Sequence, residues 1–296
     1  NRVTSGIFEP GSIFKTVTMA GALDAGAVKI TDQFDARFGI RFGRFTIDDF
    51  HGKHRVLSLP EVFKYSSNIG TIRVMQAMGK ENYRAFLTRM GFDQRVPFEL
   101  PEMRLPTVPK ELSEVGAATA SFGHGLSVSP LHMVTAYAAF VNGGNYIAPS
   151  LYKRSVQEAR PLYRQVLQPQ TSAAIRYLLR LNALEGSGSQ MNKEAQGYRV
   201  GGKTGTAEKV VEGRYSSSKV TNFFGSAFPL DDPRYAMVIM VDEPQAENPQ
   251  SGTTAGWNAG AVTGRIVQRV APMLGIAPDF SEIIDQNLVP PELRPL

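Results

Sequence analysis

The sequence predicts an α+β fold in which an antiparallel sheet is flanked by clusters of helices. Apolar residues recur at helical spacing in a series of segments up to residue 184. Three runs rich in β-branched and aromatic residues then follow one another, separated by turn residues, and a last helical pattern closes the chain. Helices first, strands gathered late and one closing helix are typical of this layout.

The first helix is expected to begin at Ser12, directly after the Pro10-Gly11 turn, and to end at Gly26. Residues 32–56 alternate aromatic, basic and glycine residues, which predicts irregular strands and loops. Three more apolar helical patterns follow, over residues 58–64, 68–78 and 81–90.

The middle of the chain alternates loops and helices. Residues 92–113 are rich in proline and have little periodicity, so we expect a loop there. Ser129 before Pro130 is a typical helix start, and this helix should stop at Asn142-Gly143-Gly144. An amphipathic helix is predicted over 170–184, with a flexible connector at 186–189.

We expect the sheet to be a meander of three antiparallel strands. The predicted strands are Tyr198–Val211, Thr221–Pro229 and Tyr235–Asp242. A final helix spans about residues 259–274. We assign residues 1–278 to one domain and residues 279–296 to a peripheral tail.

The composition excludes several classes of protein. Of 296 residues, 42% are apolar and 20% charged, which excludes a disordered or fibrous chain. Cysteine is absent, which excludes thiolate catalysis and a disulfide framework. The net charge of +5 is spread without a basic run, so no nucleic-acid partner is predicted. His51 and His54 lie in a predicted loop with no carboxylates around both, so no metal site is predicted.

One stretch matches a nucleotide-binding pattern. Residues 197–204, which end in Lys203-Thr204, fit the phosphate-loop pattern G-x-x-x-x-G-K-[ST]. A phosphate loop must follow a buried strand and lead into a helix, yet residues 190–196 are polar and Thr204-Gly205-Thr206 predicts a strand. A nucleotide hydrolase is therefore only a remote alternative.

Three other short motifs occur in a specific order along the chain. Ser12 to Lys15 reads S-x-x-K, Ser66 to Asn68 reads S-x-N, and Lys203 to Thr206 reads K-T-G-T. Each motif alone is common. Together, and in this order, they are the set found in β-lactamases and penicillin-binding proteins, so the assignment comes from recognition of that set.

The residue types suit acyl transfer through a serine. Ser12, at a helix start, would be the nucleophile, and Lys15 would be the general base because it lies one helical turn away. The Lys15 amine must be neutral to act as a base, which burial or the neighbouring cation Lys203 would favour. Ser66 and Asn68 would relay a proton and position the substrate.

The K-T-G-T run is expected on a strand edge that binds substrate. Lys203, Thr204 and Thr206 would hold a carboxylate, and Gly205 would let an extended substrate backbone approach. The backbone N–H groups of Ser12 and Thr206 would form the oxyanion hole, where each donor contributes about 3 kcal/mol.

From about Ile7 to Pro278 the chain resembles the transpeptidase domain of class B penicillin-binding proteins, on four stretches: residues 8–15, 65–70, 122–131 and 197–209. It is most similar to the septal, cell-division branch, because Gly-Tyr-Arg precedes the Lys-Thr-Gly run and Ala-Glu-Lys follows it. The resemblance implies the serine transpeptidase fold shared with β-lactamases.

The resemblance also implies an activity and a setting. The chain would be a D,D-transpeptidase without metal or cofactor, acting on stem peptides that end in D-Ala-D-Ala and acylated by β-lactams. Its partners would be a septal membrane polymerase and division proteins. It would lie on the periplasmic side of the membrane, anchored by an N-terminal helix upstream of this chain. The first strands of the family's sheet would also lie upstream, so we expect a smaller sheet here.

Two other outcomes of the same acylation stay open. Water could resolve the acyl-enzyme, as in a D,D-carboxypeptidase or a β-lactamase, although no Glu is convincingly placed to activate a deacylating water. Alternatively, acylation could persist without turnover, as in a penicillin sensor.

Overall fold

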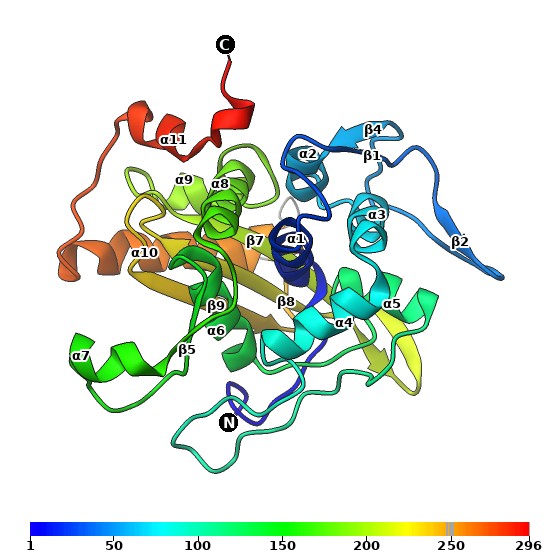
Figure 1. The fold of residues 1–296 in the computed structure, drawn as a ribbon, viewed down its shortest axis with the longest axis horizontal. Coiled ribbons are helices and arrows are strands. Elements are labelled where there is room, and N and C mark those ends of the chain that lie inside the picture. Colours follow the sequence, from blue (N-terminus) through cyan, green and yellow to red (C-terminus); the bar gives the residue numbers. More distant parts are fainter. Residues whose placement is uncertain (247, 249–251, 296) are drawn as a thin grey trace.

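The computed structural model describes residues 1–246, 248 and 252–295. Its central feature is a three-stranded antiparallel sheet in the order β7 (Gly201–Val211), β8 (Arg214–Phe228) and β9 (Tyr235–Asp242) (Figure 1). The predicted meander is therefore confirmed. Within the described residues, β7 and β9 form the two edges of this sheet.

The turn between β7 and β8 is tighter than the sequence predicted. The predicted strands left residues 212–220 between them, but the chain reverses at Glu212-Gly213, where both residues have positive φ, and β8 begins at Arg214. Lys209 is paired with Ser216 across the hairpin, and the register shifts at Glu208/Lys209. The pairing of two strands uses backbone groups, so this polar run continues the strand although it lacks the apolar alternation that predicts one.

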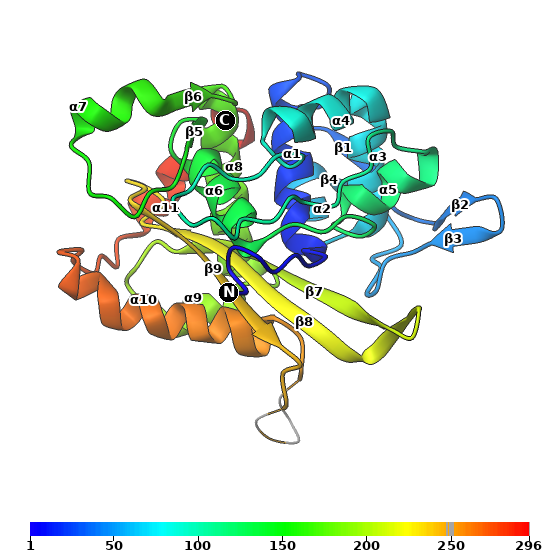
Figure 2. The same cartoon turned by 90° about the horizontal axis from the view of Figure 1, so that it is seen from below.

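Helices cover both faces of the sheet (Figure 2). The N-terminal segment forms a short 3-10 turn, η1 (Gly11–Phe14), and continues as α1 (Lys15–Asp24). Together with α6 (Pro130–Val141) and α8 (Pro169–Glu185), α1 lies over one face. The other face is covered by α9 (Ser189–Glu194) and α10 (Ala261–Met273), the latter preceded by a π-helical turn at Gly256–Gly260.

A second group of helices packs against α1 at the side away from α6. They are α2 (Leu59–Lys64), α3 (Asn68–Met78), α4 (Lys80–Arg89) and α5 (Glu114–Ser121). Because α1 is enclosed by helices and sheet, its residues from Lys15 to Ala22 are all buried.

Three of the predicted helix starts, those of α2, α3 and α6, are confirmed by serine caps. The Ser58 hydroxyl accepts the Glu61 N–H while the Glu61 carboxylate accepts the Ser58 N–H, and this capping box starts α2. Ser67 caps α3 and Ser129 caps α6 through their side-chain oxygens. A serine directly before an apolar run is a local signal of a helix start, so these boundaries could be predicted from the sequence.

The smaller elements complete the chain. The region 32–56 forms two antiparallel pairs, β1 (Gln33–Asp35) with β4 (Val56–Ser58) and β2 (Ile40–Phe42) with β3 (Phe45–Ile47). Another pair and a short helix follow α6: β5 (Asn145–Ile147), β6 (Tyr163–Gln165) and α7 (Val156–Ala159). Within the tail lies α11 (Glu282–Leu288).

Among the described residues, the sequence did not predict the α-helices α5, α7, α9 and α11 or the strands β5 and β6. The tail is tied to the body by Arg180 on α8, which donates to both carboxylate oxygens of Asp285 at 2.7 and 2.9 Å. No helix in the described residues is both long and apolar enough to span a membrane.

Candidate active site

Ser12 belongs to a segment that packs closely against the edge strand β7. Ser12 is in the 3-10 turn η1 and Lys15 is the first residue of α1. A Cβ on Gly205 would meet the Pro10 carbonyl at 2.8 Å and the Ile13 nitrogen at 2.9 Å. The absence of a side chain on Gly205 therefore makes room for the turn that carries Ser12.

The three motifs meet around the side chain of Ser66. The Lys15 amine donates to the Ser66 carbonyl at 2.5 Å and to the Ser66 hydroxyl at 3.1 Å. From β7, the Lys203 amine donates to the same hydroxyl at 2.9 Å. Ser66 itself has a positive φ of 55° in the turn before α3, an uncommon conformation that aims its hydroxyl and carbonyl at the two lysines.

The Ser12 hydroxyl makes no hydrogen bond within the described residues. The direct contact predicted between it and the Lys15 amine is therefore not seen, because that amine is engaged by Ser66. Hydrogen bonds between a nucleophile and its base are often long without substrate and tighten when it binds.

Both lysines are buried, and burial sets their protonation. Lys15 is 1% exposed and Lys203 is fully buried. Burial lowers the pKa of Lys15 to about 7, although the Asp49 carboxylate partly opposes this. Burial and the charge of Lys15 lower the pKa of Lys203 well below its usual range. A neutral amine at neutral pH is thus available one turn from Ser12.

The two threonines of the K-T-G-T run lie on the same face of β7, since they are two residues apart. The Thr204 hydroxyl donates to the Ser187 hydroxyl at 2.6 Å, and the Thr206 hydroxyl accepts the Ala255 N–H at 3.3 Å. Both threonines are half-buried. Two half-buried hydroxyls on an edge strand are suited to bind a carboxylate beside Ser12.

Asn68, at the end of the S-x-N turn, is held in place by Asp48 and Asp49, which the sequence analysis did not single out. Its amide donates to the Asp48 carbonyl at 3.2 Å. The next residue, Asp49, accepts the Ser67 hydroxyl at 2.7 Å and the Ile69 N–H at 2.9 Å. An acidic pair in a predicted loop gave no indication that it would fold back onto a turn some 20 residues later.

Another residue that the sequence did not single out, Glu9, joins three segments next to Ser12. Its carboxylate accepts the Gly125 N–H at 2.9 Å and the Tyr215 hydroxyl at 3.1 Å, and it lies 3.2 Å from a ring nitrogen of His124. Burial raises the pKa of Glu9, but the bonds from His124 and Gly125 outweigh it, so the pKa is lowered overall. The carboxylate therefore stays charged and links the segment before Ser12 to the start of β8, just after the β7–β8 turn.

The glycine before His124 is required by close packing. Gly123 has a φ of 87° and its carbonyl accepts the Gly11 N–H at 3.1 Å. A Cβ at this position would overlap the Gly11 carbonyl. The loop at residues 122–125 thus supports the turn that carries Ser12.

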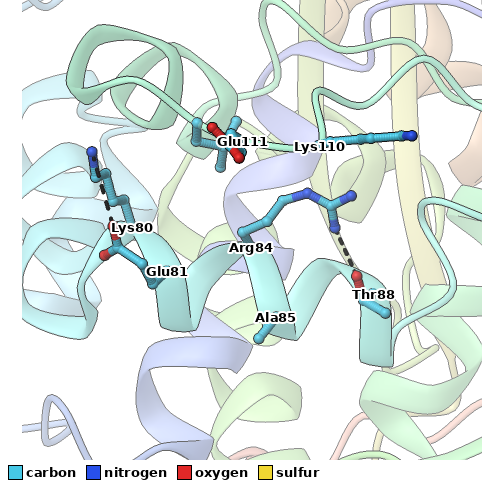
Figure 3. Close-up of a pocket in the computed structure, with 8 residues that line it drawn as sticks. Lys80, Glu81, Arg84, Ala85, Thr88, Lys110 and Glu111 are labelled. Carbon is cyan, nitrogen blue, oxygen red and sulfur yellow. Dashed lines mark hydrogen bonds and ion pairs between the residues drawn. The ribbon is translucent and has the colours of Figure 1, made fainter.

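A pocket of about 570 Å³ lies elsewhere, between α4 and the loop at residues 110–112 (Figure 3). Its Arg84 is already bonded to Thr88, Asp93 and the Pro109 carbonyl. None of the predicted site residues lines it. Among the described residues, no three histidine, aspartate or glutamate side chains gather into a metal site.

Comparison with known proteins places this geometry in a family. Residues 1–268 match the family model of the penicillin-binding protein transpeptidase domain. The probable peptidoglycan D,D-transpeptidase FtsI of Caulobacter vibrioides is 37% identical, over 93% of this chain and 48% of that protein. Stage V sporulation protein D of Bacillus subtilis is 34% identical, over 93% of this chain and 44% of that protein. The chain thus spans about half the length of these two relatives.

Solved structures agree. The transpeptidase domain of Burkholderia pseudomallei penicillin-binding protein 3 has a TM-score of 0.87 at 29% identity, covering 95% of this chain and 84% of that one. Penicillin-binding protein 3 of Mycobacterium tuberculosis, complexed with ampicillin, has a TM-score of 0.82 at 27% identity, covering 95% and 65%. The predicted fold and resemblance are both confirmed, and the chain belongs to the family of penicillin-binding protein transpeptidase domains, with FtsI and penicillin-binding protein 3 among its relatives.

Proposed function

We propose that this protein is a D,D-transpeptidase that cross-links peptidoglycan, with Ser12 as its nucleophile. The observation that carries the proposal is the meeting of two buried amines, from Lys15 and Lys203, on the Ser66 hydroxyl beside the Ser12 turn. That arrangement supplies a neutral base, a hydroxyl that relays a proton and a second amine beside it, without metal or cofactor.

Acylation would proceed as follows. The neutral Lys15 amine takes the Ser12 proton as the serine oxygen bonds to the carbonyl carbon of the D-Ala-D-Ala bond. The Ser66 hydroxyl, bonded to both lysines, passes a proton to the leaving nitrogen as the C–N bond breaks and D-alanine departs. An amine of a neighbouring stem peptide then attacks the ester, forms the cross-link and restores the serine hydroxyl.

Binding of the donor would use the edge strand β7. The hydroxyls of Thr204 and Thr206 hold the terminal carboxylate, and the Lys203 amine supports this part of β7 from behind by donating to the Thr204 carbonyl at 3.1 Å. The backbone N–H groups of Ser12 and Thr206 stabilise the oxyanion. Asn68 positions the stem peptide from the opposite wall.

The names of the relatives support this assignment. FtsI of Caulobacter vibrioides is named a probable peptidoglycan D,D-transpeptidase, and Mycobacterium tuberculosis penicillin-binding protein 3 has been solved with ampicillin and with aztreonam. We therefore propose that β-lactams acylate Ser12. The proposal also includes a septal role, with division proteins and a membrane polymerase as partners. It includes a periplasmic location with an N-terminal anchor, and a domain over residues 1–278.

The test is a turnover assay on uncrosslinked strands with pentapeptide stems, with products separated by mass. A transpeptidase yields cross-linked dimers and free D-alanine. Tetrapeptide without dimer would identify a carboxypeptidase, and stable acylation without product would identify a sensor. The Ser12→Ala variant is the control, since it keeps the fold and removes the nucleophile.

A further inference from the structure

The segment between residues 36 and 55, which we call the arm, projects from the body as the β2–β3 hairpin and its flanking turns (Figures 1 and 2). It exposes three large apolar side chains: Phe38 at 77%, Phe45 at 64% and Phe50 at 85%. Single exposed apolar residues are ordinary, but three on one short projecting segment mark a surface that another molecule covers.

The arm also carries unpaired positive charge. It holds five Lys or Arg residues against two Asp, which is +3 of the chain's net +5. Two of these cations are neutralised, because Arg37 pairs with Asp35 and Arg55 with Glu61.

The other three cations are Arg41, Arg44 and Lys53. All three are exposed, and none forms an ion pair in the described part of the chain. Arg41 donates only to the Gly43 carbonyl, and the amine of Lys53 lies 4.7 Å from the centre of the Tyr65 ring. These groups are free to meet carboxylates of a ligand.

The root of the arm is joined to the candidate active site. Asp49 accepts bonds from Ser67 and Ile69, and the carbonyl of Asp48 accepts the Asn68 amide. The Asp49 carboxylate therefore faces the S-x-N turn, whereas the exposed Asp48 carboxylate accepts the Asp49 N–H at 2.8 Å. The exposed surface of the arm thus carries three unpaired cations and three phenylalanine rings against one carboxylate. In both views the arm and the β7–β8 hairpin extend from the same side of the molecule (Figures 1 and 2).

We propose that the arm binds the uncrosslinked glycan–peptide strand beside the cleft, which rests on the function proposed above. Stem peptides carry carboxylates that complement Arg41, Arg44 and Lys53, and the phenylalanine rings would pack on the apolar faces of the sugars. A membrane surface is disfavoured, since anionic lipid recognition usually needs about four to eight clustered cations.

The experiment measures binding of the full chain to soluble, fluorescent, uncrosslinked strands. Two variants remove the two kinds of contact separately: Phe38→Ser with Phe45→Ser, and Arg41→Glu with Arg44→Glu. Each is expected to weaken strand binding about tenfold, and the charge variant should also flatten its salt dependence. Thermal unfolding shows whether each variant is folded, because exposed side chains contribute little to stability.

The matched controls lie far from the arm. Phe280→Ser removes an equally exposed ring, 75% exposed in the tail, and Lys153→Glu with Arg160→Glu reverses two exposed charges near α7. Both should bind strands like the wild type.

Unchanged strand binding by both arm variants would overturn the proposal. So would a loss that appears only on phosphatidylglycerol vesicles, which would make the arm a membrane contact. Acylation by fluorescent penicillin is measured separately: its absence in the wild type would refute the proposed function, while the strand-binding comparison would still decide the role of the arm.

Discussion

The pKa of Lys15 leads to a quantitative prediction for acylation. Burial lowers this pKa from an ordinary value of 10.5 to about 7. At pH 7 about half of the Lys15 amines are then neutral, against roughly 0.03% for an unperturbed lysine, a gain of about a thousandfold in active base. We therefore expect the acylation rate to rise about tenfold per pH unit below pH 7 and to level off above about pH 8.

The assay is the second-order rate of labelling by a fluorescent penicillin, measured from about pH 5.5 to about pH 9.5. Loss of the folded state would not produce the pH dependence expected for the acylation rate. Because the folded pKa lies below the unfolded one, the unfolded state binds more protons between about pH 7 and about pH 10.5, and stability attributable to Lys15 falls as pH decreases across that window. Below pH 7 both states are protonated, so Lys15 causes no further loss there.

A rate that is still rising at about pH 9.5 would refute the reasoning, because it would show a lysine with an ordinary pKa. A rate independent of pH would do so as well, since no neutral amine would then be needed.

Three further predictions concern residues that support the site. Asp49→Asn removes the charge that raises the pKa of Lys15, so the acid limb of acylation should move to lower pH in the same rate assay. Gly123→Ala places a Cβ against the Gly11 carbonyl at a positive φ, so thermal unfolding should show a loss of about 2 kcal/mol or more. Asp285→Asn removes the charged partner of a buried arginine, and urea unfolding should show a loss of about 2 kcal/mol.

Each of the three has a close control. Asp48→Asn should leave the pH profile in place, since Asp48 contacts the S-x-N turn through its backbone carbonyl. Gly125→Ala should cost less than Gly123→Ala, because its Cβ would meet only the Thr119 hydroxyl, at 3.3 Å. Glu282→Gln should be near neutral. A pH profile unmoved by Asp49→Asn, or equal losses within either of the other pairs, would contradict these accounts.

Much of the fold could be predicted because its signals are local. The starts of α2, α3 and α6 follow from serine caps, and the meander follows from β-rich runs separated by turn residues. Helix α9 was missed because the segment 189–194 is short and polar. It is stabilised by packing against α10, a contact between distant segments that local sequence does not show.

The site was predictable in composition but less so in geometry. The motif set indicated that Lys15, Ser66 and Lys203 would meet, and the structure brings them together. The sequence could not show that Ser12 lies in a 3-10 turn, or that the Lys15 amine bonds to Ser66 and not to Ser12. The roles of Asp49 and Glu9 depend on contacts between distant segments, and a single sequence carries no sign of those.

The identity of the acylated residue tests the central claim most directly. The protein is labelled with a fluorescent penicillin, digested, and the modified peptide is located by mass spectrometry. The account predicts one adduct, on Ser12, that is absent from the Ser12→Ala variant and forms slowly in Lys15→Met. An adduct on another residue, or an unlabelled wild-type protein, would contradict it.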